Sequence, residues 1–119
     1  MKLQESGENY LETILILENK NGYVRSIDIA NTLNFSKPSV SRAVKVLKEN
    51  NYIIVNKDGH IVFTNEGRKK AESVYERHVT LTKFLIQLGV DSKQAEEDAC
   101  RIEHIISEET HQCIKKAMK

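Results

Sequence analysis

The chain has 119 residues, of which 39% are hydrophobic and 29% are charged. This composition is typical of one compact domain, or of two small ones that share a core, and it excludes an intrinsically disordered chain. The longest apolar runs, Ile14–Leu17 and Tyr52–Val55, are far too short to span a bilayer, and the first nine residues hold no apolar stretch typical of a signal peptide. Two cysteines, Cys100 and Cys113, are too few for a disulfide framework. We therefore expect a cytoplasmic protein with free thiols and no membrane contact.

The net charge of +1 is unevenly distributed along the chain. Residues 23–70 carry nine Lys and Arg against four Asp and Glu, a local charge of +5, whereas residues 1–22 and 71–119 each carry −2. A basic segment between two acidic ones is typical of a polyanion-binding module attached to another part. The middle of the chain is therefore the candidate nucleic-acid-binding region.

An amphipathic helix is expected near the start of the chain. Ser6 is a candidate N-cap for this helix, and Asn21-Gly22 provides its end. Asn9 and Glu12 lie three residues apart on a polar flank. Taken alone, this flank is more typical of a solvated surface than of a binding site.

Two short helices joined by a tight turn are predicted next, after an extended piece at Tyr23–Arg25. Ser26 is a candidate cap for a helix over Ile27–Leu33. Ser36 caps a further helix that runs to about Asn50 and has a proline in its first turn, where a missing N–H costs nothing. Two short helices with this connection indicate a helix-turn-helix.

A basic hairpin follows the second of these helices. The strand-like runs Tyr52–Asn56 and His60–Thr64 are joined by Lys57-Asp58-Gly59, and Asp-Gly is a strong hairpin signal. Residues 1–64 are therefore predicted to be a winged helix-turn-helix that binds double-stranded DNA. Its outward hydroxyls permit close approach to a duplex, and its basic side chains suit phosphates or guanine. The candidate DNA-binding residues are Arg25, Ser36, Lys37, Pro38, Ser39, Ser41, Arg42, Lys45, Lys57 and His60.

The rest of the chain, residues 65–119, is predicted to be helical. A helix over Glu66–Leu88 ends at a glycine, a second carries Ala95–Ser107, and a third runs from Glu108 to about Met118. His78 lies within the apolar stripe of the first of these helices. A histidine in that setting is more often a core residue than a ligand.

The stretch Ala95–Ser107 combines an apolar face with a face that can chelate. At about 100° per residue, Glu96, Cys100, Glu103 and His104 share one side of a helix. A thiol, a carboxylate and an imidazole at i, i+3 and i+4 suit a late first-row divalent metal better than calcium or magnesium. Charged stripes are also typical of solvated faces, and a cysteine beside alanines is typical of a small core residue. The residues alone leave both interpretations open.

Six segments, in order, match one known pattern. They are Asn-Tyr-Leu-Glu (9–12), Ile-Ala (29–30), Ser-Lys-Pro-Ser-Val-Ser (36–41), Thr-Asn-Glu-Gly (64–67), Arg-His (77–78) and Cys-Arg-Ile-Glu-His (100–104). Through them the whole chain resembles the diphtheria toxin repressor family of metal-dependent transcriptional regulators. The resemblance implies a fold that is mainly α with a small β-wing, in which a winged helix-turn-helix precedes a helical dimerisation and metal-binding domain. It also implies Fe²⁺ or Mn²⁺ as co-repressor, with Co²⁺, Ni²⁺ or Zn²⁺ able to bind in vitro.

The resemblance also implies a set of metal ligands drawn from both parts of the chain. Iron-type members have Cys where Cys100 stands and a methionine at the Asn9 position. Manganese-type members have Asp at the Asn9 position, Glu where Glu12 stands and a carboxylate at the Cys100 position. This sequence mixes the two patterns, so the metal stays open. Glu96 falls where iron-type members carry a histidine of a second site, and nothing here corresponds to their SH3-like barrel. The candidate metal ligands are Glu12, His78, Cys100, Glu103, His104, Asn9 and Glu96.

We therefore predict a homodimeric repressor of metal-homeostasis genes that binds a palindromic operator when its metal is bound. One alternative is a winged-helix regulator that is independent of metal or senses redox state through Cys100. Another is a small metal-binding protein or metalloenzyme with an incidental basic patch. No nucleophile, base and orienting group occur together in the sequence, which favours a regulator over an enzyme.

Overall fold

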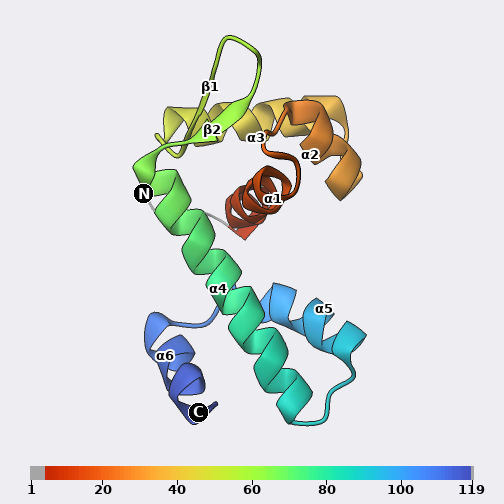
Figure 1. The fold of residues 1–119 in the computed structure, drawn as a ribbon, viewed down its shortest axis with the longest axis vertical. Coiled ribbons are helices and arrows are strands. Elements are labelled where there is room, and N and C mark those ends of the chain that lie inside the picture. The colour runs from red at the N-terminus through yellow and green to blue at the C-terminus, as the bar shows by residue number, and fades with distance from the viewer. Residues whose placement is uncertain (1–4, 119) are drawn as a thin grey trace. The chain divides into compact units, whose positions relative to one another are not determined.

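The computed structural model describes residues 5–118 (Figure 1). Residues 1–4 and 119 lie outside the described part. The expectation of no signal peptide falls partly on them, as do the outer limits of the predicted parts 1–64 and 65–119. The elements in chain order are α1 (Glu5–Asn21), α2 (Ser26–Leu33), α3 (Lys37–Glu49), β1 (Ile53–Val55), β2 (Ile61–Phe63), α4 (Asn65–Gln87), α5 (Ser92–Ile102) and α6 (Glu108–Ala117). The predicted fold class, mainly α with a small two-stranded wing, is confirmed. No helix within residues 5–118 is both long and apolar enough to cross a membrane.

The chain forms two compact units, Met1–Glu72 and Ser73–Lys119, which divide within α4. The core of the first unit is built from α1, α2, α3 and the hairpin. Its best-buried side chains, with at most 1% of their surface exposed, include Leu11, Ile14, Ile29, Leu47 and Ile53. Truncating one such side chain to alanine typically costs about 2–5 kcal/mol. The domain boundary predicted after residue 64 stays a prediction.

The helix-turn-helix is fixed by local caps. Ser36 caps α3 as predicted, because its Oγ accepts the N–H of Ser39 at 3.3 Å. The predicted cap at Ser26 is wrong by one residue. Arg25 is the N-cap of α2, and its N–H donates to the Asp28 carboxylate at 2.9 Å. The N–H of Asp28 donates in turn to the main-chain carbonyl of Arg25 at 3.0 Å. These two contacts stabilise the helix start without a side-chain acceptor at position 25. The Ser6 prediction is also wrong, since α1 already includes Glu5.

The hairpin is a short antiparallel wing. Its strands have three residues each and pair Ile53 with Phe63, so they are shorter than the predicted runs. The side chain of Asn56 accepts the N–H groups of Asp58 and His60, both at 3.0 Å, and Gly59 has a φ of +78°. The inner ends of the two predicted runs, Asn56 and His60, therefore belong to the turn. Gly59 takes the left-handed position in this turn.

The start of α4 is anchored to the end of α3 and the first strand. Tyr52 O accepts the N–H of Thr64 at 3.1 Å, and Thr64 Oγ1 accepts the N–H of Gly67 at 3.0 Å. A Cβ at Gly67 would lie only 1.8 Å from Tyr52 O. Only glycine permits this approach, which explains physically why the Thr-Asn-Glu-Gly segment ends in glycine.

The second unit consists of the rest of α4 with α5 and α6, which lie on opposite sides of it (Figure 1). The buried side of α5 is lined by small residues, Ala95 and Ala99. The predicted helix to Ser107 is wrong in extent, because α5 ends at Ile102 and residues 103–106 form a turn. Ser107 is extended, with ψ 163°, because it caps α6 and accepts the N–H of Thr110 at 3.0 Å. A single helix cannot pass through an extended residue.

Candidate metal centre and nucleic-acid interface

The carboxylate of Glu103 lies at the centre of a polar cluster in the second unit. Its side chain is fully buried, with 0% exposed. Oε2 lies 2.9 Å from Nδ1 of His78, and Oε1 lies 3.2 Å from Nε2 of His104. Burying a carboxylate is costly unless it is paired with hydrogen-bond donors or positive charge. The imidazole of His78, on α4, pairs with Oε2, whereas the imidazole of His104, in the turn after α5, lies beside Oε1 without a hydrogen bond to it.

Cys100 joins the same cluster. One ligand atom from each of Cys100, Glu103 and His104 lies within 4.8 Å of the others. The cluster combines a sulfur, a carboxylate oxygen and an imidazole nitrogen, which suits a divalent transition metal. Oε1 of Glu103 is buried and accepts no hydrogen bond among the described residues, despite its short distance to His104. A buried oxygen with a free lone pair beside a thiol and an imidazole fits a cation.

His78 and Glu96 lie at the edge of this cluster. His78 is partly exposed, at 20% of its side-chain surface, so it is not the enclosed core histidine that its stripe allowed. Its Nε2 lies 4.0 Å from Oε1 of Glu96, whose side chain is 69% exposed. Glu96 is therefore within ion-pair distance of His78 but remains largely in solvent.

Asn9 and Glu12 are on α1, in the first unit. The solvated flank that the residues alone favoured is wrong for Glu12, which is buried with 8% exposed, while Asn9 is half-buried. A buried glutamate on a short amphipathic helix needs a compensating group. The ligand roles of Asn9 and Glu12 stay predictions.

The exposed side of α3 carries the predicted basic residues. Lys37, Arg42 and Lys45 are exposed. The hydroxyl of Ser36 donates to Ser39 Oγ at 2.9 Å, and Arg42 Nη2 donates to the same oxygen at 3.3 Å. These two serines therefore order the first turn and orient Arg42.

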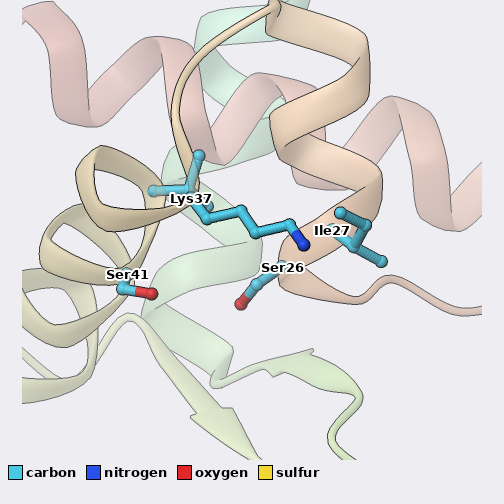
Figure 2. A pocket seen from close by; sticks show the side chains of 5 residues that line it. Ser26, Ile27, Lys37 and Ser41 are labelled. Carbon is cyan, nitrogen blue, oxygen red and sulfur yellow. The ribbon is translucent and has the colours of Figure 1, made fainter.

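A hollow of about 300 Å³ opens between α2 and α3 on the same side. Figure 2 shows the side chain of Lys37 extending across it toward Ile27 and Ser26, with Ser41 on the α3 side. It combines apolar side chains with two hydroxyls and one ammonium group. Its lining residues are Ser26, Ile27, Lys37, Val40 and Ser41.

The wing carries two of the predicted DNA-binding residues in different settings. Lys57 is exposed in the turn, whereas the His60 ring stacks on Tyr23 with centroids 4.9 Å apart. The guanidinium of Arg25 lies 5.6 Å from the centroid of the same Tyr23 ring. Sequence reasoning missed Tyr23, whose ring contacts both of these groups. Its position beside Arg25 in an extended segment was the available signal.

Sequence reasoning also missed Arg77. This residue donates to the main chain of the turn that carries Glu103 and His104. The Arg-His pair at 77–78 contributes to the family resemblance, but only its histidine is predicted from the sequence to be functional.

Two family models match consecutive parts of the chain. The N-terminal DNA binding domain model of the iron dependent repressor family matches residues 2–61. The metal binding and dimerisation domain model of the same family matches residues 64–119.

Individual relatives match along the whole chain. An uncharacterised HTH-type transcriptional regulator of Methanocaldococcus jannaschii is 31% identical over 119 residues, which cover 98% of this chain and 95% of that protein. The manganese regulator SloR is 26% identical with a TM-score of 0.84, covering 99% of this chain and 54% of that one. The IdeR of T. acidophilum is also 26% identical, with a TM-score of 0.80, covering 99% of this chain and 55% of that one. The chain thus spans about half the length of these two solved structures. By both family models and by this identity, the chain belongs to the iron dependent repressor family, a family of metal-dependent, DNA-binding transcriptional regulators and not of enzymes.

Proposed function

We propose that this repressor senses a divalent metal through Cys100, Glu103 and His104, with His78 as a further ligand. The observation that carries the proposal is the buried Glu103 carboxylate, which has an imidazole within 3.2 Å of each oxygen and the Cys100 thiol in the same cluster. Without a cation, a buried carboxylate between two histidines is an expensive arrangement. A bound divalent ion would supply the positive charge that this arrangement lacks.

The metal itself is proposed to be Fe²⁺ or Mn²⁺. The thiol of Cys100 favours the softer ion, and the carboxylate of Glu12 favours the harder one. SloR, at 26% identity, is described as a manganese regulator, which supports manganese as one of the two. Glu12, Asn9 and Glu96 are proposed to complete or modify the ligand set.

The regulatory mechanism follows from the positions of these ligands in the sequence. Glu12 and Asn9 belong to the unit that carries α3 and the wing, and the other ligands belong to the second unit. Ligands drawn from both units would restrict the arrangements that the DNA-binding unit can adopt. Metal and operator binding would then be coupled reciprocally, typically by about 1–3 kcal/mol.

The binding partner is proposed to be a palindromic operator in the cytoplasm. A homodimer formed through the second unit would present two copies of α3 to half-sites one helical turn apart. The regulated genes are proposed to be those of metal homeostasis, since the co-repressor reports the supply of that metal.

Selection of duplexes from a random DNA pool tests this function and identifies the operator in the same step. The pool is incubated with the protein under anaerobic conditions and with one of Fe²⁺, Mn²⁺, Co²⁺, Ni²⁺, Zn²⁺ or a chelator. We expect a palindromic sequence to be enriched with metal and not with chelator. Equal enrichment with chelator would contradict metal dependence and favour a metal-independent regulator.

A double variant tests the ligand set on the selected operator. Glu103→Ala with His104→Ala should abolish the metal-stimulated part of operator binding. Glu97→Ala, an exposed acidic residue on α5, is the matched control and should bind as the wild type does. Metal-stimulated binding by the double variant would show that the ligand assignment is wrong.

A further inference from the structure

Residues 103–106 follow the end of α5 and form a turn outside any helix. The last carbonyl groups of any α-helix lack intrahelical partners, and α5 ends at Ile102. The carbonyl of Ile102 accepts the N–H groups of Ile105 and Ile106. Arg77, on α4, binds carbonyls of the turn beyond this helix end. Its Nη1 donates to the carbonyl oxygens of Glu103, at 3.3 Å, and of Ile106, at 3.1 Å. These two carbonyls bracket the turn that carries Glu103 and His104.

The other end of the same guanidinium is fixed by α6. Nη2 of Arg77 donates to Oε1 of Glu108 at 3.0 Å, and the Arg77 side chain is only 19% exposed. A guanidinium offers several donors in one rigid plane, so it can contact two carbonyls and a carboxylate together. Its positive charge also suits the C-terminal end of a helix. A lysine has the charge but not this planar fork.

Arg77 and His78 act on the same residue of the turn. Arg77 binds the main-chain carbonyl of Glu103, and His78 lies 2.9 Å from its carboxylate. Two consecutive residues of α4 therefore fix both the backbone and the side chain of Glu103. The position of the proposed ligands depends on contacts 25 or more residues away in the sequence.

We infer that Arg77 is a positioning residue for the metal centre, which holds the turn at residues 103–106 so that Glu103 and His104 present their donor atoms to one ion. This inference rests on the proposed metal site. Removal of groups that orient metal ligands typically lowers metal affinity by about 10- to 100-fold. Arg77 touches no metal in this role and acts through the backbone that it binds.

Direct metal titration tests the inference. We expect Arg77→Met to bind Co²⁺ at least about tenfold more weakly than the wild type and to change the d–d absorption of the complex. Arg77→Lys should recover part of the loss. The matched control is Lys115→Met, which removes the ion pair between Lys115 and Glu76. That pair also joins α6 to α4 but does not touch the turn, so its loss should leave the Co²⁺ affinity unchanged.

Hydrogen exchange of the metal-free protein gives an independent readout. The amides of Ile105 and Ile106 both donate to Ile102 O, so they report on the turn. They should exchange faster in Arg77→Met than in Lys115→Met. If Arg77→Met does not fold, as judged by circular dichroism, Arg77→Lys decides by the same measurements. Unchanged Co²⁺ affinity and unchanged exchange in a folded Arg77 variant would overturn the inference.

The two hypotheses fail in distinguishable ways. A wild-type protein that binds none of the tested metals contradicts the proposed function, whatever the Arg77 variants do. A wild type that binds metal, with Arg77 variants that bind it equally well, contradicts only the role of Arg77.

Discussion

Oε2 of Glu103 lies 2.9 Å from Nδ1 of His78, although the two residues are 25 positions apart in the chain. This contact brings a charged group that sequence periodicity places on α5 together with an imidazole from the apolar stripe of α4. It explains why a histidine occurs among apolar neighbours there. The pair is the structural basis of the first prediction.

Glu103→Gln keeps the shape of the side chain but removes its negative charge. We expect metal to raise the melting temperature of the wild type and not of this variant, because only a state that binds metal is stabilised by it. At a metal concentration of about 100 times Kd the wild-type gain is about 2.7 kcal/mol. Thermal denaturation with and without Mn²⁺ measures the difference, and Glu97→Gln is the control. An equal metal-induced shift in both variants would contradict a ligand role for Glu103.

Cys100→Ser removes the soft donor from the cluster while nearly preserving its size. We expect the Co²⁺ complex to lose its thiolate charge-transfer absorption and the affinity for Co²⁺ and Zn²⁺ to fall more than that for Mn²⁺. Competition with a fluorescent chelator gives the affinities. Cys113→Ser, at an exposed position on α6, should change neither property. Persistence of the charge-transfer band in Cys100→Ser would rule out Cys100 as a ligand.

Gly67→Ala should destabilise the first unit, although alanine is normally the better helix residue. The added Cβ would lie 1.8 Å from Tyr52 O, so the backbone has to shift. Overpacking of this kind typically costs about 1–3 kcal/mol. Urea denaturation measures the effect, with Lys69→Ala on the exposed side of the same helix as control. Stabilisation by Gly67→Ala would mean that the close approach to Tyr52 is relaxed in solution.

Glu108 is expected to make stability depend on pH. Hydrogen bonds donated by Gln112 and Arg77 hold the pKa of its carboxyl below the ordinary value. A lowered folded-state pKa stabilises the protein above the unfolded-state pKa, and this contribution is lost as the pH falls through the folded-state value. Because the side chain is 59% exposed, the contribution stays below about 1 kcal/mol.

The variant for this test is Glu108→Gln in the metal-free protein. It should be less stable than the wild type at neutral pH. The difference in free energy of unfolding between the two proteins should become smaller as the pH falls below about 5. Urea midpoints across this range give this difference, with Glu109→Gln as the neighbouring control. A stability difference that does not change with pH would show that it does not arise from the ionisation of Glu108.

Lys37 and Lys45 are exposed on α3 and are expected to bind DNA phosphates. For each phosphate that the protein no longer neutralises, the slope of log affinity against log salt should become about 0.9 units less steep. We expect Lys37→Ala with Lys45→Ala to weaken binding to all sequences alike and to reduce the salt slope accordingly. Fluorescence anisotropy on the selected operator measures both, with Lys93→Ala on α5 as control. An unchanged salt slope in the double variant excludes these lysines from the interface.

Local signals in the sequence predicted the elements of the first unit well. Ser36 caps α3, and the turn around Asp58-Gly59 joins the two strands, because a cap or a tight turn depends only on residues a few positions apart. The buried state of Glu12 was not predictable in this way, since the pattern of α1 places it on a polar flank. Burial of a single carboxylate depends on what packs over it, which helical periodicity does not contain.

The end of α5 shows the same limit within the candidate site. Helical spacing correctly grouped Cys100, Glu103 and His104, because residues 103 and 104 stay close to the last turn of the helix. It also extended the helix to Ser107, since nothing local within residues 95–106 marks an end. The turn is also held by side-chain contacts from Arg77, 26 and 29 residues away, which no periodicity within α5 could reveal.

Because α5 ends one residue before Glu103, two of the proposed ligands are carried by a turn and not by a helix. A helix dictates the spacing of its side chains, whereas a turn takes the shape that its neighbours impose. Exchanges at Arg77 or Glu108 can therefore alter the separation of the donor atoms while every ligand stays the same. On this basis we expect that two relatives with identical ligands can prefer different metals, because residues that never touch the ion shape the turn that presents two of the ligands.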